Sequence, residues 1–236
     1  WEVTMVETET IAGNEAAVAF TPSGQPRIAS NSSEGLLYAA YNGSTWEKQI
    51  TYPTSSWQPS ITLDSEGSPA ITWQAGTQGL GLVRLNNDQW QIEFIDPRGG
   101  RYGYTSSLKY HPDGHLVVCY FNFEDDSIYY GSNEGGNWAL EKVDDAVGDG
   151  CTLNFDEDGC PAITYRGFSG ISFAKHDGDR WHVEVIAGSG YSPSLSYQAD
   201  GNPAVAFGNS AGVAYARYNG VSWIVEEAVA GGGDPS

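Results

Sequence analysis

The fold of this chain is decided by a unit best seen in residues 193–223, PSLSYQADGNPAVAFGNSAGVAYARYNGVSW. It holds three short runs in which apolar and polar residues alternate, with turns near Gly201 and Gly212, and it ends on Trp223 just after Tyr218-Asn219-Gly220. Alternation at a period of two is typical of half-buried β-strands. Glycine supplies the positive φ that tight hairpins need. We therefore predict three antiparallel strands and a fourth that begins at the tryptophan.

The same unit recurs along the whole chain of 236 residues. Its marker tryptophan returns at spacings of 45, 44, 48, 43 and 42 residues, at Trp1, Trp46, Trp90, Trp138, Trp181 and Trp223. Self-similarity at this period is typical of radial or solenoid repeats, and neither terminus looks like the cap that a solenoid needs. Four antiparallel strands per repeat, repeated five times, predict an all-β fold, a five-bladed β-propeller.

A single domain accounts for this pattern. The repeats, at about 1–45, 46–89, 90–137, 138–180 and 181–223, belong to one propeller domain over residues 1–230, and 231–236 read as a flexible tail. There are six tryptophan-led fourth strands but five sets of the other three. Either residues 1–8 or residues 223–229 supply the fourth strand of the last blade. We therefore predict a ring that is closed by terminal strands, and one of these two segments is not needed for the five blades.

Composition excludes several classes of partner. The net charge is −19, from 30 acidic and 11 basic residues, and no basic stripe exists that could bind nucleic acid or an anionic membrane. No run approaches the ~18 apolar residues that span a bilayer. The acidity favours an extracellular or secreted protein. We expect no cofactor.

The cysteines and the acidic turns offer no metal site. The chain has an odd number of cysteines without CxxC spacing, namely Cys119, Cys151 and Cys160. This pattern predicts free buried thiols. Turns such as Asp64-Ser65-Glu66-Gly67 and Asp156-Glu157-Asp158-Gly159 faintly resemble calcium loops. They lack the full ligand set of such loops, so we expect the aspartates to hold the turns themselves.

The turn before the marker tryptophan carries a family resemblance. It reads Asn42-Gly43-Ser44-Thr45-Trp46, His176-Asp177-Gly178-Asp179-Arg180-Trp181 and Asn219-Gly220-Val221-Ser222-Trp223. These stretches resemble the Asp-box of the sialidase propeller superfamily, S-x-D-x-G-x-T-W, although they are one residue shorter before the tryptophan. The resemblance implies a turn that staples each blade and has no catalytic role. In blade number and unit length the chain also resembles five-bladed lectins of the tachylectin type.

The predicted ligand surface is the upper face, where the loops that join fourth to first strands and second to third strands gather. Two residues before each first strand lies a ring of side chains that could stack sugar rings and bind hydroxyl groups: Asn14, Trp57, Tyr104, Asp149 and Tyr191. A second ring just past the second strands includes Gln74 and Arg166. The alternative is that these residues plug the mouth of the channel and pack on one another.

Three functions remain open. We predict non-catalytic binding of a glycan or another small polar ligand.

A sialidase-like glycoside hydrolase is the second candidate. Arg98, Arg101 and Arg166 lie near the upper loops, but two of them share one loop, whereas the sialidase family takes its arginine triad from separate blades. Asp149 with Glu15, Asp96 or Asp125 could form a carboxylate pair, and no spacing singles one out. Since the histidines lie at the lower turns, we assign no catalytic and no metal-binding residue. The third possibility is a protein-interaction platform or an excised or engineered repeat array.

Overall fold

The computed structural model describes residues 6, 12–54, 56–96 and 102–230. Nineteen strands are found in this part of the chain, together with the short turns η1 (Gly76–Gln78) and η2 (Glu134–Gly136). The prediction of an all-β chain built from four-stranded antiparallel units is confirmed. We call these units blades and number them along the chain.

Each blade is a meander in which successive strands pair. Blade one consists of β1 (Ala12–Phe20), β2 (Pro26–Ser32), β3 (Gly35–Tyr41) and β4 (Trp46–Tyr52). Blade two consists of β5 (Trp57–Leu63), β6 (Pro69–Gln74), β7 (Leu80–Asn86) and β8 (Gln89–Asp96). Blade three consists of β9 (Tyr102–Tyr110), β10 (Leu116–Asn122), β11 (Ser127–Ser132) and the first part of β12 (Ala139–Phe155). Blade four consists of the second part of β12, β13 (Pro161–Gly167), β14 (Gly170–His176) and β15 (Trp181–Ala187). Blade five consists of β16 (Tyr191–Tyr197), β17 (Pro203–Asn209), β18 (Gly212–Tyr218) and β19 (Trp223–Ala230).

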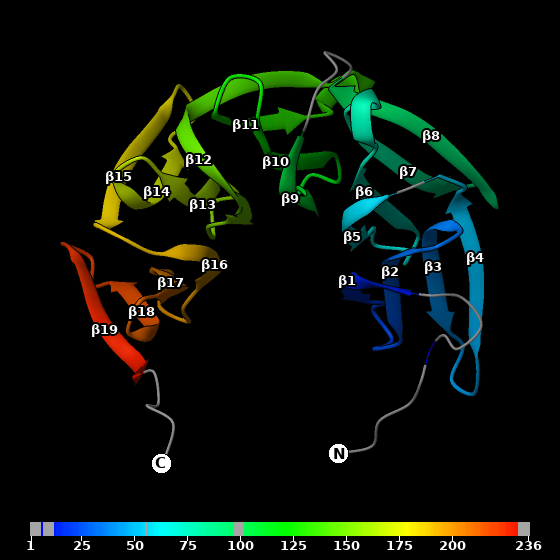
Figure 1. Ribbon diagram of the computed structural model, residues 1–236, viewed down its shortest axis with the longest axis horizontal. Coiled ribbons are helices and arrows are strands. Elements are labelled where there is room, and N and C mark those ends of the chain that lie inside the picture. Colours follow the sequence, from blue (N-terminus) through cyan, green and yellow to red (C-terminus); the bar gives the residue numbers. More distant parts are fainter. Residues whose placement is uncertain (1–5, 7–11, 55, 97–101, 231–236) are drawn as a thin grey trace.

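Strand β12 is shared by two blades. Residues 139–145 pair with β11, and residues 146–155 pair with β13, so blades three and four form one seven-stranded sheet. The first strands lie innermost, and each is next to the first strand of the following blade. Figure 1 shows the blades fanned around a central space.

The predicted hairpin turns are confirmed. The glycines that close the five turns between first and second strands all have φ between 80° and 90°: Gly24, Gly67, Gly114, Gly159 and Gly201. Aspartates hold several of these turns, as expected. The Oδ1 atom of Asp156 accepts the backbone N–H groups of Asp158 at 3.0 Å and Cys160 at 2.8 Å. These carboxylates therefore stabilise the turns by accepting hydrogen bonds from backbone N–H groups.

The core consists of four apolar clusters, one between each pair of neighbouring blades. In each cluster the marker tryptophan of one blade packs against the third strand of the blade before it. The ring centroids lie 5.2 Å apart for Tyr38 and Trp90, and 5.2 Å apart for Phe173 and Trp223. Such edge-to-face pairs contribute about 1 kcal/mol beyond the apolar area that they bury. The tryptophans thus join the blades.

The ring is not closed within the described residues. Blade five is completed by its own β19, which pairs with β18, so Trp223–Ala230 is the fourth strand of that blade. Figure 1 shows an arc with an opening between blade five and blade one. The predicted closure by strands from both termini is not found in this part of the chain. Except for Val6, the alternative segment, residues 1–8, lies outside the described residues, as does the tail 231–236.

The prediction that all three cysteines are free thiols is wrong. Cys119 of β10 and Cys151 of β12 form a disulfide with Cα atoms 6.3 Å apart, and Cys160 alone is free among the described cysteines. Cys119 lies on the face of blade three that meets blade four, and both cysteines belong to the cluster between these blades. Their separation of 32 residues hid the pair, because the contact exists only once the two blades pack together.

We predict that Gly81→Ala strongly destabilises the fold. A Cβ atom at this position would lie 2.5 Å from the Cζ2 atom of Trp73, whose side chain is fully buried and has no room to move. The free energy of unfolding in urea should fall by about 3 kcal/mol. Gly188→Ala is the matched control, because no atom lies within 4 Å of its Cβ position. Equal stability of the two variants would contradict this packing.

We also predict that peptide mapping without reduction recovers a Cys119–Cys151 cross-linked pair. Replacing both residues by serine should lower the free energy of unfolding by about 2–4 kcal/mol, because the cross-link restricts the unfolded chain. Cys160→Ser should leave stability nearly unchanged, since this thiol is free and only half-buried. Alkylation of all three thiols in the unreduced protein would rule out the disulfide.

Candidate functional site

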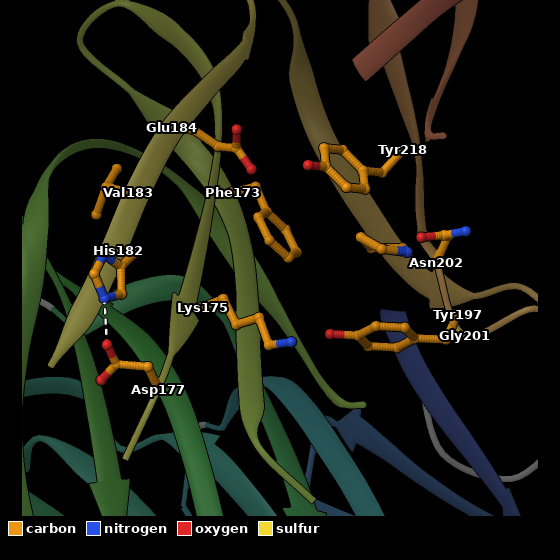
Figure 2. A pocket seen from close by; sticks show the side chains of 11 residues that line it. Phe173, Lys175, Asp177, His182, Val183, Glu184, Tyr197, Gly201, Asn202 and Tyr218 are labelled. Atoms are coloured by element: carbon orange, nitrogen blue, oxygen red, sulfur yellow. Dashed lines mark hydrogen bonds and ion pairs between the residues drawn. The ribbon is translucent and has the colours of Figure 1, made fainter. Parts of the chain in front are cut away.

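A groove of about 570 Å³ lies between blades four and five. It lies on the lower face, beside the turns that follow β14 and β16, and Figure 2 shows it from close by. Blade four and blade five each supply one wall. The lining residues are Phe173, Lys175, Asp177, His182, Val183, Glu184, Tyr197, Gly201, Asn202, Pro203 and Tyr218. We call this the 4/5 groove.

Apolar rings form the deeper part of the 4/5 groove. Phe173 of β14 and Tyr218 of β18 both pack on Trp223, with ring centroids 5.2 and 5.7 Å away. The contact that joins the two blades therefore also fixes these rings. Aromatic faces of this kind suit the C–H surface of a sugar or another small amphipathic molecule.

A buried hydroxyl group and an ammonium group face the same space. Figure 2 shows the side chains of Lys175 and Tyr197 pointing toward one another from opposite walls. The Tyr197 hydroxyl is buried and has no hydrogen-bond partner in the described part of the protein. Burial raises the pKa of Tyr197, and the nearby charge of Asp156 raises it further. The phenol is therefore neutral and available as a hydrogen-bond donor.

Lys175 is held by an ion pair at the rim. Its Nζ atom lies 2.6 Å from Oδ2 of the nearly buried Asp156. Burial alone would raise the pKa of Asp156, but Lys175 and the N–H groups of Cys160 and Asp158 outweigh it, so the pKa lies below its usual value. The ammonium keeps donor positions for a ligand, since it has three N–H groups.

Asp177 and His182 form the other polar side of the groove. The backbone N–H groups of Arg180 and Asp179, followed by His182, hold the pKa of Asp177 well below its usual range. The His182 Nε2 atom and Asp177 Oδ2 are in direct contact. Because its pKa is lowered, Asp177 stays ionised, orients the imidazole and carries no proton to give to a substrate.

An equivalent groove of about 240 Å³ lies between blades three and four. Its lining includes His111 and His115, which flank the turn between β9 and β10, and His176 at the end of β14. His111 and His115 stack with ring centroids 4.5 Å apart, and burial followed by the charge of His111 lowers the pKa of His115. Among the described residues, no three histidine, cysteine or acidic side chains are grouped closely enough to hold a metal ion.

Of the predicted ring on the upper face, the structure describes the side chains of Trp57 and Tyr191. Trp57 and Tyr191 are exposed, and each precedes a residue with positive φ, 51° at Gln58 and 49° at Ser192. The first strand bulges at this point in both blades and turns the aromatic side chain outward. Gln74 is paired with Trp57 across the ladder. Tyr191 instead covers Gly208, where a Cβ atom would lie 2.3 Å from the ring.

The side chains of most other predicted site residues lie outside the described part of the chain. Arg166 is exposed on β13. Asn14, Tyr104 and Asp149 occupy β1, β9 and β12, but their side chains lie outside the described set, as do Arg98 and Arg101 altogether. The predicted upper-face site therefore stays a prediction.

Possible carboxylate partners for Asp149 have structural roles. Asp96 is buried and accepts a 2.8 Å hydrogen bond from the Tyr120 hydroxyl. The Glu15 carboxylate accepts the N–H of Gln58 in the next blade at 2.6 Å, and Asp125 accepts the hydroxyl of Tyr129 at 2.7 Å. Each of these hydrogen bonds fixes the carboxylate to the scaffold.

Sequence reasoning missed the 4/5 groove because it searched the upper face. The 4/5 groove combines the third and fourth strands of blade four with the first turn of blade five, so its two walls come from separate parts of the sequence. Lys175 itself gave no signal, because its place in the other blades is taken by Ala40, Arg84, Ser132 and Arg217, two of which are also basic.

No protein-family model matches the sequence, and no curated protein is similar to it. The fold is similar to solved propellers. A six-bladed fungal lectin from Aleuria aurantia, described with a fucose recognition mode, matches with a TM-score of 0.64 and 13% identity, over 96% of this chain and 80% of that one. A protein of unknown function from Dyadobacter fermentans matches at 0.60 with 14% identity, over 89% and 79%. A Hadza microbial sialidase matches at 0.58 with 13% identity, over 88% and 57%.

These likenesses establish a β-propeller-like fold and nothing finer, because the identities are low. The lectin has six blades, whereas five are traced in this chain. In the described part of the chain, no helix has the length and apolar character needed to cross a bilayer.

We predict that Lys175→Met destabilises the protein in a pH-dependent way. The low pKa of Asp156 in the folded state contributes stability above the unfolded value of about 4, and this contribution is lost as the pH falls. The variant should lose about 1 kcal/mol at pH 7, and the difference should shrink as the pH falls below about 4 and through the lowered pKa of Asp156. Lys142→Met, which breaks the exposed pair with Asp145, should have no measurable effect. A pH-independent loss would show that Lys175 acts through packing alone.

Proposed function

We propose that this chain is a non-catalytic, carbohydrate-binding propeller and that the 4/5 groove is its principal site. The observation that carries the proposal is the unpartnered, buried hydroxyl of Tyr197 beside Lys175, in a groove with aromatic walls. A buried polar group without a partner is costly, and a ligand hydroxyl would satisfy it.

The groove matches a sugar in chemistry and in size. Lys175 and Tyr197 donate hydrogen bonds, Glu184 and Asn202 supply acceptors, and Phe173 and Tyr218 give apolar faces. The volume is within the range of small-molecule sites. The Aleuria aurantia lectin has been solved with α-methyl-L-fucoside and with Fucα1-6GlcNAc, so fucosides are the first ligands to test.

The upper-face ring is the second candidate surface, and the exposure of Trp57 and Tyr191 supports it. The sialidase-like alternative has less support, because the carboxylates proposed to assist Asp149 are hydrogen-bonded within the scaffold. We further propose an extracellular location. A disulfide between blades and the net charge of −19 both suit an oxidising, extracellular medium.

Isothermal titration with methyl glycosides, preceded by a glycan array, tests the proposal. Tyr197→Phe removes only the hydroxyl and should weaken binding by up to about tenfold, the worth of one hydrogen bond. Tyr218→Ala should abolish it, because the apolar wall is lost. Trp57→Ala on the upper face is the matched control and should bind as the unaltered protein does.

The reverse pattern, with binding lost in Trp57→Ala and kept in Tyr197→Phe, would move the site to the upper face. Absence of binding to every glycan would reject the carbohydrate function. Release of sugar from chromogenic glycosides, abolished by Asp149→Asn, would establish the hydrolase instead.

A further inference from the structure

The carboxylate of Glu184, in the 4/5 groove, lacks the cation that its equivalents in blades two and five have. Glu184 lies on the fourth strand of blade four, directly opposite Phe173 of the third strand. The residues that pair with the third strand in the same way in the other blades are Gln49, Glu93, Glu141 and Glu226. A carboxylate therefore occupies this position in four of the five blades.

Blades two and five neutralise this carboxylate internally. The Nη2 atom of Arg84 lies 3.4 Å from Oε1 of Glu93, and Nη2 of Arg217 lies 3.4 Å from Oε1 of Glu226. Each arginine stands on the third strand, two positions after the residue opposite the glutamate, so the two side chains meet diagonally on one face of the sheet. The cation is thus supplied by the blade itself.

Blades one and three do not leave an isolated charge either. In blade one the position is neutral, because Gln49 replaces glutamate and accepts the indole N–H of Trp90 at 2.8 Å. In blade three Glu141 lines the groove that also holds three imidazoles.

Blade four has a cation at the place of the arginines, but it is engaged elsewhere. The Nζ atom of Lys175 lies 2.6 Å from Oδ2 of Asp156, whose side chain is only 8% exposed. Figure 2 shows the ring of Phe173 between the ammonium group of Lys175 and the carboxylate of Glu184. Within the described part of the chain, no residue forms an ion pair or a hydrogen bond with Glu184. The groove therefore contains a carboxylate without a counter-charge.

The surroundings of Glu184 also favour a cation. Asp177 adds a second, ionised carboxylate to the lining, and the Glu157 carboxyl group lies 3.8 Å from the Cβ position of Gly201 at the turn of blade five. The rings of Phe173 and Tyr218 line the groove together with Glu184. Aromatic faces carry a negative quadrupole and attract cations.

We propose that the 4/5 groove selects amino sugars, that is, glycosides that carry a protonated primary amine. The ammonium group binds Glu184 beside the rings of Phe173 and Tyr218, while Lys175 and Tyr197 donate hydrogen bonds to sugar oxygens at the other end. A uronic acid is disfavoured, because it brings a like charge next to Glu184. This inference rests on the proposed carbohydrate function and names the class of carbohydrate.

The experiment compares methyl glycosides that share one ring and differ in charge. Isothermal titration at pH 7 uses the glucosaminide, its N-acetyl derivative and the glucuronide, together with the galacto series. The sugar amine resembles an α-amino group, with a pKa near 8, and is mostly protonated. We expect the amine to bind about fivefold more tightly than the N-acetyl derivative, and the uronide to bind most weakly. At about 1 M salt, where the Debye length is about 3 Å, this preference should shrink.

Two glutamine variants make the result specific. Glu184→Gln keeps the shape of the side chain and removes its charge, so the amine and the N-acetyl derivative should bind equally. Glu226→Gln is the matched control, because Glu226 occupies the same place in blade five, is paired with Arg217 and lies outside the groove lining. This variant should keep the fivefold preference.

Three results would overturn the inference. The first is equal binding of the amine and the N-acetyl derivative by the unaltered protein, which leaves the proposed carbohydrate function standing. The second is a preference that persists in Glu184→Gln. The third is tightest binding of the uronide, lost in Lys175→Met, which would show that the groove uses Lys175 as its charge. If no glycoside binds, charged or neutral, the proposed function is rejected and this inference with it.

Discussion

The contact between the marker tryptophan of one blade and the third strand of the blade before it is the interaction on which this structure depends. A four-stranded antiparallel meander is apolar on both faces in its inner part, and it cannot bury either face alone. The tryptophans at the start of the outer strands bring successive sheets together around four separate cores. Because each blade relies on its neighbours, the two end blades expose apolar side chains whose equivalents are buried in the other blades, such as Val18 and Val213.

The same contact creates the grooves on the lower face. Trp223 lies between Phe173 and Tyr218, so the blades are held together near the outer strands while their turns remain apart. The scaffold repeats, but the lining does not. Lys175 and Tyr218 in the 4/5 groove correspond to Ser132 and His176 in the groove between blades three and four. The lining of the 4/5 groove therefore includes an ammonium group, whereas the lining of the other groove has three imidazoles and no lysine.

The local features of the fold could be predicted because short-range physics fixes them. The alternation around Leu195 and the positive φ of Gly201 are consequences of strand geometry and hairpin sterics, and both are confirmed. The disulfide and the 4/5 groove could not be predicted in the same way. Cys119 and Cys151, or Lys175 and Tyr197, meet only through the packing of two blades, and the repeat pattern does not state which faces touch. The upper-face site stays a prediction: Trp57 and Tyr191 are exposed, and the ring of Tyr191 also lies against Gly208.

By itself the sequence determined the repeating unit, its strand order, its turns and the role of the tryptophans. The alternation within strands and the turn residues depend only on residues that are close together in the chain. It also predicted a sixth outer-strand segment, residues 1–8, most of which lies outside the described residues. Only the tertiary structure decided where the grooves form between blades and which cysteines are joined. These properties depend on the spacing between blades, and that spacing is set by side chains from distant parts of the chain packing against one another.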